Sequence, residues 1–227
     1  MPSDCHRLKF PALVVDGSSA RFFAGILDAE GRWLAKVEAC KPALESLFES
    51  VNTALETAEL EIADLRAYLY SAGPGSVLGL RLCAMAIETW HRLEEKAPAL
   101  FAFNSLELVA ADLIDRSVVS QESLLVSDWK KEVWNGLRLH PRGWDSVEPF
   151  ETSIVQNWTG PLYHLPARKG WQSAPANAIE VHYDPACLSR VFSRPGLLSG
   201  TNGVCLYESG LNTFKKWTAE RHRLPST

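Results

Sequence analysis

A glycine-rich turn between a strand and a helix limits the fold of this chain more than any other feature. The sequence predicts a strand at 67–72, a turn at 73–76 and a helix at 78–93. Glycines in such a turn let two backbones approach closely, and the free amides at the start of a helix can bind an anion. The turn lacks the Lys-Ser/Thr pair of a Walker loop and the spacing of a dinucleotide fingerprint. Two interpretations stay open: a phosphate site, or a tight turn in which Ser76 caps the helix and Gly79 allows close packing.

The segments around this turn predict an α/β lobe. Three antiparallel strands joined by turns are expected at 13–15, 21–27 and 32–37. Apolar residues recur every three or four positions at 42–58, which predicts an amphipathic helix, and 99–103 is expected to be a further strand. The alternation of strands and helices favours one domain over residues 1–103.

The second half of the chain repeats this order incompletely. We expect a helix at 105–116 with Ser105 as its N-cap, followed by strands at 123–127 and 132–139. Beyond residue 140 the periodicity fails. Short strands at 153–155 and 178–181 and a helix at 184–192, capped by Asp184, are the elements expected there. Residues 104–227 are therefore predicted to form a reduced, irregular second lobe.

Composition excludes several classes of protein. The five cysteines contain no C-x-x-C pair, and the six histidines contain no pair three or four apart, which argues against a disulfide framework and a metal site. No apolar run reaches the ~18 residues of a membrane span, and the N-terminus has no apolar segment typical of a secretory signal. With a net charge of −4 among 227 residues, the chain lacks the basic field of a nucleic-acid binder. A cytoplasmic protein is expected.

Asp16 is the first candidate site residue, because it ends a strand that is expected to be buried. A buried carboxylate is costly unless it is hydrogen-bonded or bound to a metal. It is either the remnant of a metal or phosphate site, or the start of a polar turn with Ser18 and Ser19.

Four short motifs in a fixed order resemble one known family. They are Asp16-Gly17-Ser18 against D-T-S, residues 73–81 against G-P-G-S-F-T-G-L-R, residues 105–110 against S-L-E-A-L-A, and residues 128–134 against D-A-R-R-x-E-V-Y. Together they span about residues 12–139. The chain therefore resembles the TsaB/YeaZ family, whose members belong to the bacterial machinery that makes threonylcarbamoyladenosine in tRNA.

The resemblance implies an actin-like ATPase fold of the actin/Hsp70/sugar-kinase type, with two RNase H-like lobes of mixed sheets flanked by helices. In that superfamily the residues matching Asp16, Gly73, Gly75 and Ser76 face a nucleotide. TsaB-like proteins are regarded as degenerate partners, so no intrinsic cofactor is implied, and ATP or ADP is expected only at a complex interface. No catalytic residue and no metal ligand is assigned.

A partner interface is expected on the two helices of the first lobe. The second helix carries apolar residues over more of its surface than a sheet alone would bury. The resemblance places an interface there, with these residues: Leu44, Leu47, Phe48, Val51, Leu55, Arg81, Leu82, Met85, Thr89 and Trp90. The alternative is that both are ordinary buried helices of an α/β layer.

Two functions remain open. The first is a non-catalytic partner that is a homodimer when alone and supports a TsaD-like enzyme, together with a small ATPase, in modifying the adenosine beside the tRNA anticodon. Contact with tRNA would then be indirect, although the basic tail at 215–223 could touch it. The second is a stand-alone ATP-binding phosphotransferase or a peptidase-like enzyme of the same superfamily.

Overall fold

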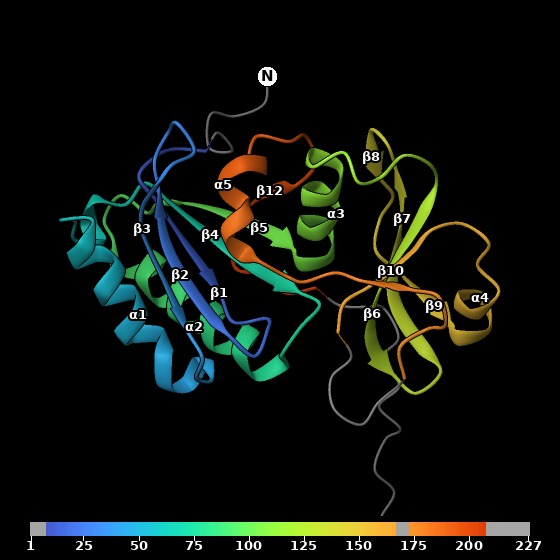
Figure 1. Ribbon diagram of the computed structural model, residues 1–227. Coiled ribbons are helices and arrows are strands. Elements are labelled where there is room, and N and C mark those ends of the chain that lie inside the picture. Colours follow the sequence, from blue (N-terminus) through green and yellow to red (C-terminus); the bar gives the residue numbers. More distant parts are fainter. Residues whose placement is uncertain (1–7, 167–172, 208–227) are drawn as a thin grey trace, which may run out of the picture.

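The fold consists of two six-stranded mixed sheets with helices between and outside them (Figure 1). It is seen in a computed structural model that describes residues 8–166 and 173–207. In the first sheet the strand order is β12-β5-β4-β1-β2-β3. Its strands are β1 (Ala12–Asp16), β2 (Phe22–Leu27), β3 (Trp33–Ala39), β4 (Ala67–Gly73), β5 (Ala99–Asn104) and β12 (Leu198–Thr201).

Helices cover both faces of the first sheet because its central strands are apolar on both sides. Along β1, Leu13 and Val15 pack in the cluster that includes α1 (Ala43–Thr57) and α2 (Val77–Leu93). Ala12 and Val14 pack in the opposite cluster, with α3 (Ser105–Asp115) and α5 (Leu188–Val191). Successive side chains of a strand point to opposite faces, so one short strand supports both layers. A 3-10 turn, η2 (Ile62–Asp64), precedes β4.

The second sheet has the order β11-β10-β6-β7-β8, and β9 pairs with β7. Its longest strands, β6 and β7, form an antiparallel hairpin. Its strands are β6 (Ser123–Lys130), β7 (Val133–His140), β8 (Gly143–Trp144), β9 (Glu148–Glu151), β10 (Leu162–His164) and β11 (Ile179–Glu180). A short helix, α4 (Thr152–Gln156), places Val155 in the cluster on one face.

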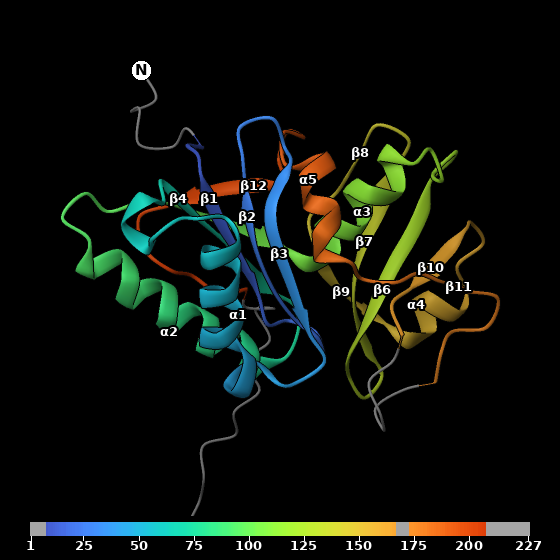
Figure 2. The same cartoon turned by 60° about the vertical axis from the view of Figure 1, so that its left-hand side comes forward.

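Helix α3 joins the two lobes, and it lies between the two sheets in Figures 1 and 2. Leu108 and Ala111 pack in the cluster of the first sheet, whereas Leu106, Val109 and Leu113 pack against the second. The chain then returns from β11 through η3 (Pro185–Cys187) and α5 to β12, which pairs with β5. The expected division after residue 103 stays a prediction, and the topology adds that the last strand lies in the first sheet.

The predicted fold class of mixed sheets flanked by helices is confirmed, as is the opening antiparallel meander. The strand expected at 153–155 is wrong, because these residues belong to α4. The N-cap of α3 is Asn104, whose Oδ1 accepts from the amide of Leu106 at 2.9 Å. The helix expected at 184–192 consists of η3 followed by α5, and Asp184 caps it as predicted. The basic tail at 215–223 lies outside the described residues.

Candidate functional site

The glycine turn packs directly on the turn that follows β1. A Cβ atom on Gly75 would lie 2.6 Å from the Ser18 backbone oxygen, and one on Gly79 would lie 2.0 Å from the Gly17 oxygen. The amide of Ser76 donates to the Ser18 oxygen at 2.7 Å. Only glycine allows so close an approach of two backbones, so these glycines are used to join two turns of the protein.

Gly73 and Ser76 shape the turn itself. Gly73 has φ +106°, a conformation that side chains rarely adopt. The Ser76 hydroxyl accepts from the amide of Gly79 at 3.3 Å, which is the N-cap expected from the sequence. The geometry therefore has the features of the tight-turn interpretation. The nucleotide assignment of Asp16, Gly73, Gly75 and Ser76 stays a prediction.

Asp16 is buried at the end of β1, with 1% of its surface exposed. Its Oδ1 accepts from the amide of Ser18 at 2.6 Å, and its Oδ2 accepts from the hydroxyl of Tyr183. Burial raises the pKa of Asp16 above its ordinary value, and the hydrogen bonds from Tyr183 and Ser18 offset part of this effect. The side chains of Ser18 and Ser71 also hydrogen-bond to Tyr183. We call Asp16, Ser18, Ser71 and Tyr183 the strand-end cluster.

Several groups that could contact a nucleotide make hydrogen bonds within the protein instead. Both carboxylate oxygens of Asp16 already accept hydrogen bonds from the protein, and the amide of Ser76 donates to Ser18. A phosphate needs free donors at the glycine turn. Within the described residues, no group of three or more His, Cys, Asp or Glu side chains could hold a metal ion.

A second carboxylic acid, Glu107, lies near the glycine turn at the start of α3. Burial raises the pKa of Glu107 to about 7. The neighbouring Ser105 hydroxyl donates to the Pro74 oxygen at 2.6 Å, which ties α3 to the turn. No local sequence pattern singles out Tyr183 or Glu107 as a site residue, because their environments depend on contacts between distant segments.

The predicted interface residues divide by exposure. Leu47, Val51 and Leu55 are buried in the core below α1, and Leu82 and Trp90 are half-buried. The others, Leu44, Phe48, Arg81, Met85 and Thr89, are exposed. Leu78, which is not among the predicted residues, is also exposed, although it lies within the glycine-turn motif.

Exposed apolar side chains therefore lie on two neighbouring helices. Leu44, Phe48, Leu78 and Met85 are each 61% to 68% exposed, and we call them the α1–α2 apolar surface. Figure 2 shows α1 and α2 side by side on the outer face of the first lobe. The ring of Phe48 meets that of Trp90 edge-on, with centroids 6.1 Å apart, so the two helices are in contact. Large apolar residues exposed on adjacent elements are typical of an interface.

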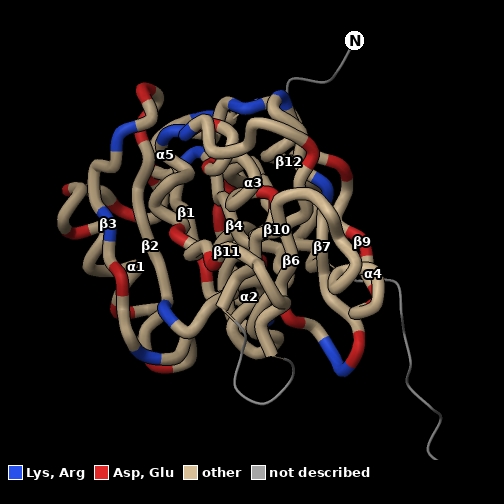
Figure 3. Tube along the Cα trace, turned by 45° about the vertical axis from the view of Figure 1, so that its right-hand side comes forward, with Lys and Arg blue, Asp and Glu red and all other residues tan. Residues whose placement is uncertain are grey.

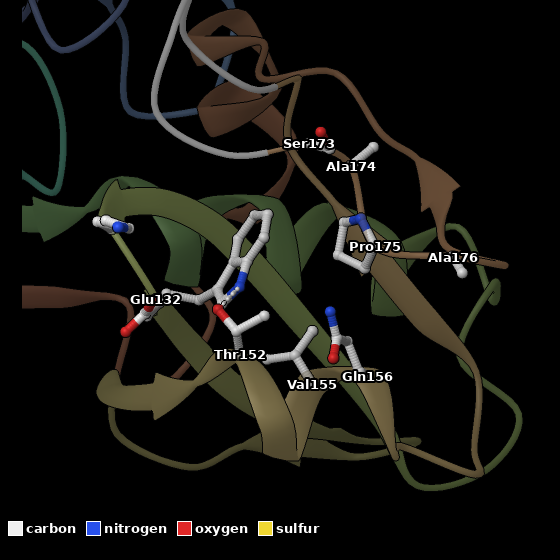
Figure 4. Close-up of a pocket in the computed structure, with 10 residues that line it drawn as sticks. Glu132, Thr152, Val155, Gln156, Ser173, Ala174, Pro175 and Ala176 are labelled. Carbon is white, nitrogen blue, oxygen red and sulfur yellow. Dashed lines mark hydrogen bonds between the residues drawn. The ribbon is translucent and has the colours of Figure 1, made fainter.

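A pocket of about 610 Å³ lies in the second lobe (Figure 4). Thr152, Val155 and Gln156 of α4 line one side, and Pro175 lies across from them. The indole nitrogen of Trp134 donates to the Thr152 hydroxyl at 3.1 Å, and Trp134 is 2% exposed. Trp134 thus belongs to the core of this lobe.

Charges and helices give two further observations. In the view of Figure 3, several Lys and Arg segments of the described chain lie near one another along the top, beside α5, and the others are scattered among Asp and Glu. None of the helices in the ranges that the structure describes is long and apolar enough to cross a membrane.

Two solved structures share the fold of this chain. YeaZ from Pseudomonas aeruginosa matches with a TM-score of 0.54 and 15% identity, over 68% of this chain and 74% of that one. An uncharacterised protein with similarity to the peptidase YeaZ from Pseudomonas aeruginosa matches with a TM-score of 0.60 and 16% identity. The match covers 86% of this chain and 98% of that one. No family model matches the sequence, and the search of curated proteins found no match. The structural matches establish a YeaZ-like fold.

Proposed function

We propose that this protein is a non-catalytic subunit that supports a TsaD-like enzyme in threonylcarbamoyl modification of the adenosine next to the tRNA anticodon. The observation that carries the proposal is the α1–α2 apolar surface on a YeaZ-like fold. The proposed pathway, threonylcarbamoyl modification of tRNA, comes from the motif resemblance in residues 12–139. A small ATPase of the same pathway is the second proposed partner, and tRNA is contacted mainly by the other subunits.

The energetics of the α1–α2 apolar surface favour association. Covering an exposed Leu, Phe or Met side chain is worth roughly 1.5 to 3 kcal/mol. Four such residues on adjacent helices give an apolar centre, while Arg81 and Thr89 on α2 supply polar groups beside it. This composition suits a helix-on-helix interface with a second subunit. Without that subunit, a second copy of this chain would cover the same helices.

A non-catalytic role also accounts for the strand-end cluster. Its carboxylate is hydrogen-bonded within the chain, and its serines contact Tyr183. A stand-alone phosphotransferase would need these groups for its substrate. On this proposal ATP or ADP is bound, if at all, where subunits meet.

The test is co-purification of the full chain with the TsaD-like protein of the same organism. We expect a complex with the wild type and a loss of affinity of roughly 30-fold or more with Met85→Arg, because the change places a charge in an apolar interface. Ile154→Arg is the matched control, since Ile154 is also exposed but lies on α4 in the second lobe. That variant should bind as the wild type does.

Two outcomes would contradict the proposal. One is a wild-type protein that forms no complex and hydrolyses ATP or a peptide on its own, which is the behaviour of the enzyme alternative. The other is equal loss of binding in Met85→Arg and Ile154→Arg, which would place the interface elsewhere. Analytical ultracentrifugation of the same variants measures whether the homodimer uses the same helices.

A further inference from the structure

Tyr183 lies where the chain returns from the second sheet to the first. It follows β11 and precedes Asp184, whose side chain accepts from the amide of Ala186 at 2.9 Å and fixes the start of η3. The segment crosses between the two lobes in Figure 1. The backbone directly after Tyr183 is thus held in place by the cap of η3.

The ring of Tyr183 belongs to both lobes. It packs against the cluster that contains Val14 and Leu108, and also against the cluster that contains Leu125 and Leu137. Its hydroxyl then reaches Asp16, 167 positions earlier in the chain. One side chain therefore links the end of β1, helix α3 and the second sheet.

The polar end of Tyr183 is surrounded by groups that a ligand would otherwise contact. Asp16 and Ser18 come from the end of β1, and Ser71 comes from β4 beside it. The glycine turn closes the same place from the other side, because Gly75 and Gly79 lie against the backbone of residues 17–18. The family resemblance implies nucleotide phosphates at this strand end, yet Asp16 and the amide of Ser76 make their hydrogen bonds within the protein.

We propose that Tyr183 is an internal latch, a side chain that occupies the nucleotide end of the fold and joins the two lobes in place of a ligand. The hydrogen bond to Asp16 provides the polar half of the latch, and the ring provides the apolar half. The lobes are thereby held in one arrangement without a cofactor. This proposal is independent of the partner role, which rests on α1 and α2.

A double-mutant cycle tests the latch in the full chain. Tyr183→Phe keeps the ring and removes the hydroxyl, while Asp16→Ala removes both acceptor oxygens. We expect Tyr183→Phe to lower the folding equilibrium constant roughly 10- to 100-fold in the wild-type background, as for a lost hydrogen bond to a charged group. In the Asp16→Ala background the same change should cost less than about threefold.

Tyr70→Phe is the matched control. The Tyr70 hydroxyl also holds the C-terminal part of the chain, since it accepts from the amide of Cys205 at 2.9 Å. Its removal should lower stability equally in the wild-type and the Asp16→Ala backgrounds, because Tyr70 has no part in the strand-end cluster. Equal effects of Tyr183→Phe in the two backgrounds would overturn the latch.

Calorimetric titration with the magnesium complex of a non-hydrolysable ATP analogue tests whether the strand end is closed to a nucleotide. The wild type is expected to give no binding at millimolar concentration. Binding by the wild type that Asp16→Ala abolishes would overturn the proposal, since the strand end would then be open to a nucleotide. Complex formation with the TsaD-like partner is measured separately, so failure of the latch and failure of the partner role are distinguishable.

Discussion

At the scale of single residues, Gly79 is held under the tightest steric constraint near the candidate site. A Cβ atom there would lie 2.0 Å from the carbonyl oxygen of Gly17, and that oxygen belongs to a buried turn. Backbone atoms cannot rotate away as a flexible side chain can. The glycine therefore determines how closely α2 approaches the end of β1.

Gly79→Ala should destabilise the protein by about 3 kcal/mol, because α2 must move away from β1 to accept the methyl group. Urea unfolding at equilibrium measures the change. Gly143→Ala is the matched control, since nothing lies within 4 Å of a Cβ at Gly143. We expect its effect to stay within about 0.5 kcal/mol. Similar losses of stability in both variants would show that the contact with Gly17 is not the cause of the destabilisation.

The buried side chain of Glu107 makes the stability of the folded protein depend on pH. Burial raises its pKa from 4.5 to about 7, so the folded state favours the protonated acid more than the unfolded state does. The stability linked to this group is therefore complete below pH 4.5 and falls as the pH rises through about 7. Glu107→Gln should remove this loss and make the variant relatively more stable at pH 8 than at pH 5. Urea midpoints at the two pH values test this.

An unchanged difference between the midpoints at pH 5 and pH 8 would contradict the assignment to Glu107. Asp16 contributes in the same direction, because burial raises its pKa as well. Comparing Glu107→Gln with the wild type removes that shared contribution, since Asp16 is present in both.

At the scale of elements, the sequence predicts best the features that depend on neighbouring residues. The cap of α2 links Ser76 to Gly79, three positions apart, and Asp184 caps η3 through Ala186. The meander of β1, β2 and β3 is likewise built from adjacent segments. In each case the residues that interact are close enough in the chain for the pattern to be visible.

The wrong predictions at this scale have physical reasons. Asn104 and Ser105 are both good capping residues, and the choice between them depends on Pro74, whose oxygen takes the Ser105 hydroxyl. The segment 153–155 is too short for a helical period, and α4 buries one residue, Val155. Tertiary contacts determine the N-cap and the element type in such cases, so they cannot be predicted from a single sequence.

At the scale of the whole molecule, the contacts that define the candidate site are distant in sequence. Tyr183 and Asp16 meet only because the chain passes through the second lobe and returns. Motif order leads to the YeaZ-like fold, but none of the motifs includes Tyr183. The predicted interface is incomplete for the same reason. Periodicity shows that a helix carries apolar residues, but it does not show that Leu47 faces the core and Phe48 faces outward.

Removal of residues 198–227 should leave the first sheet incomplete. The truncated chain loses β12, exposes the edge of β5 and loses the amide that binds Tyr70. We expect aggregation and a lower melting temperature, because an open apolar edge strand pairs with other chains. Size-exclusion chromatography and circular dichroism measure both.

Removal of residues 208–227 alone is the control for this truncation. It leaves β12 and the Tyr70 contact in place, so this shorter deletion should cause less aggregation than removal of residues 198–227. Equal aggregation of the two shortened chains would contradict the role given to β12.

The position of β12 also has a consequence for synthesis on the ribosome. Five neighbouring strands of the first sheet come from residues 12–104, whereas the sixth is translated after the whole second sheet. At an elongation rate of about 5 to 20 residues per second, the edge of β5 waits on the order of ten seconds for its partner. During that interval the nascent first lobe presents an unpaired edge strand, which can pair with other chains until β12 is made.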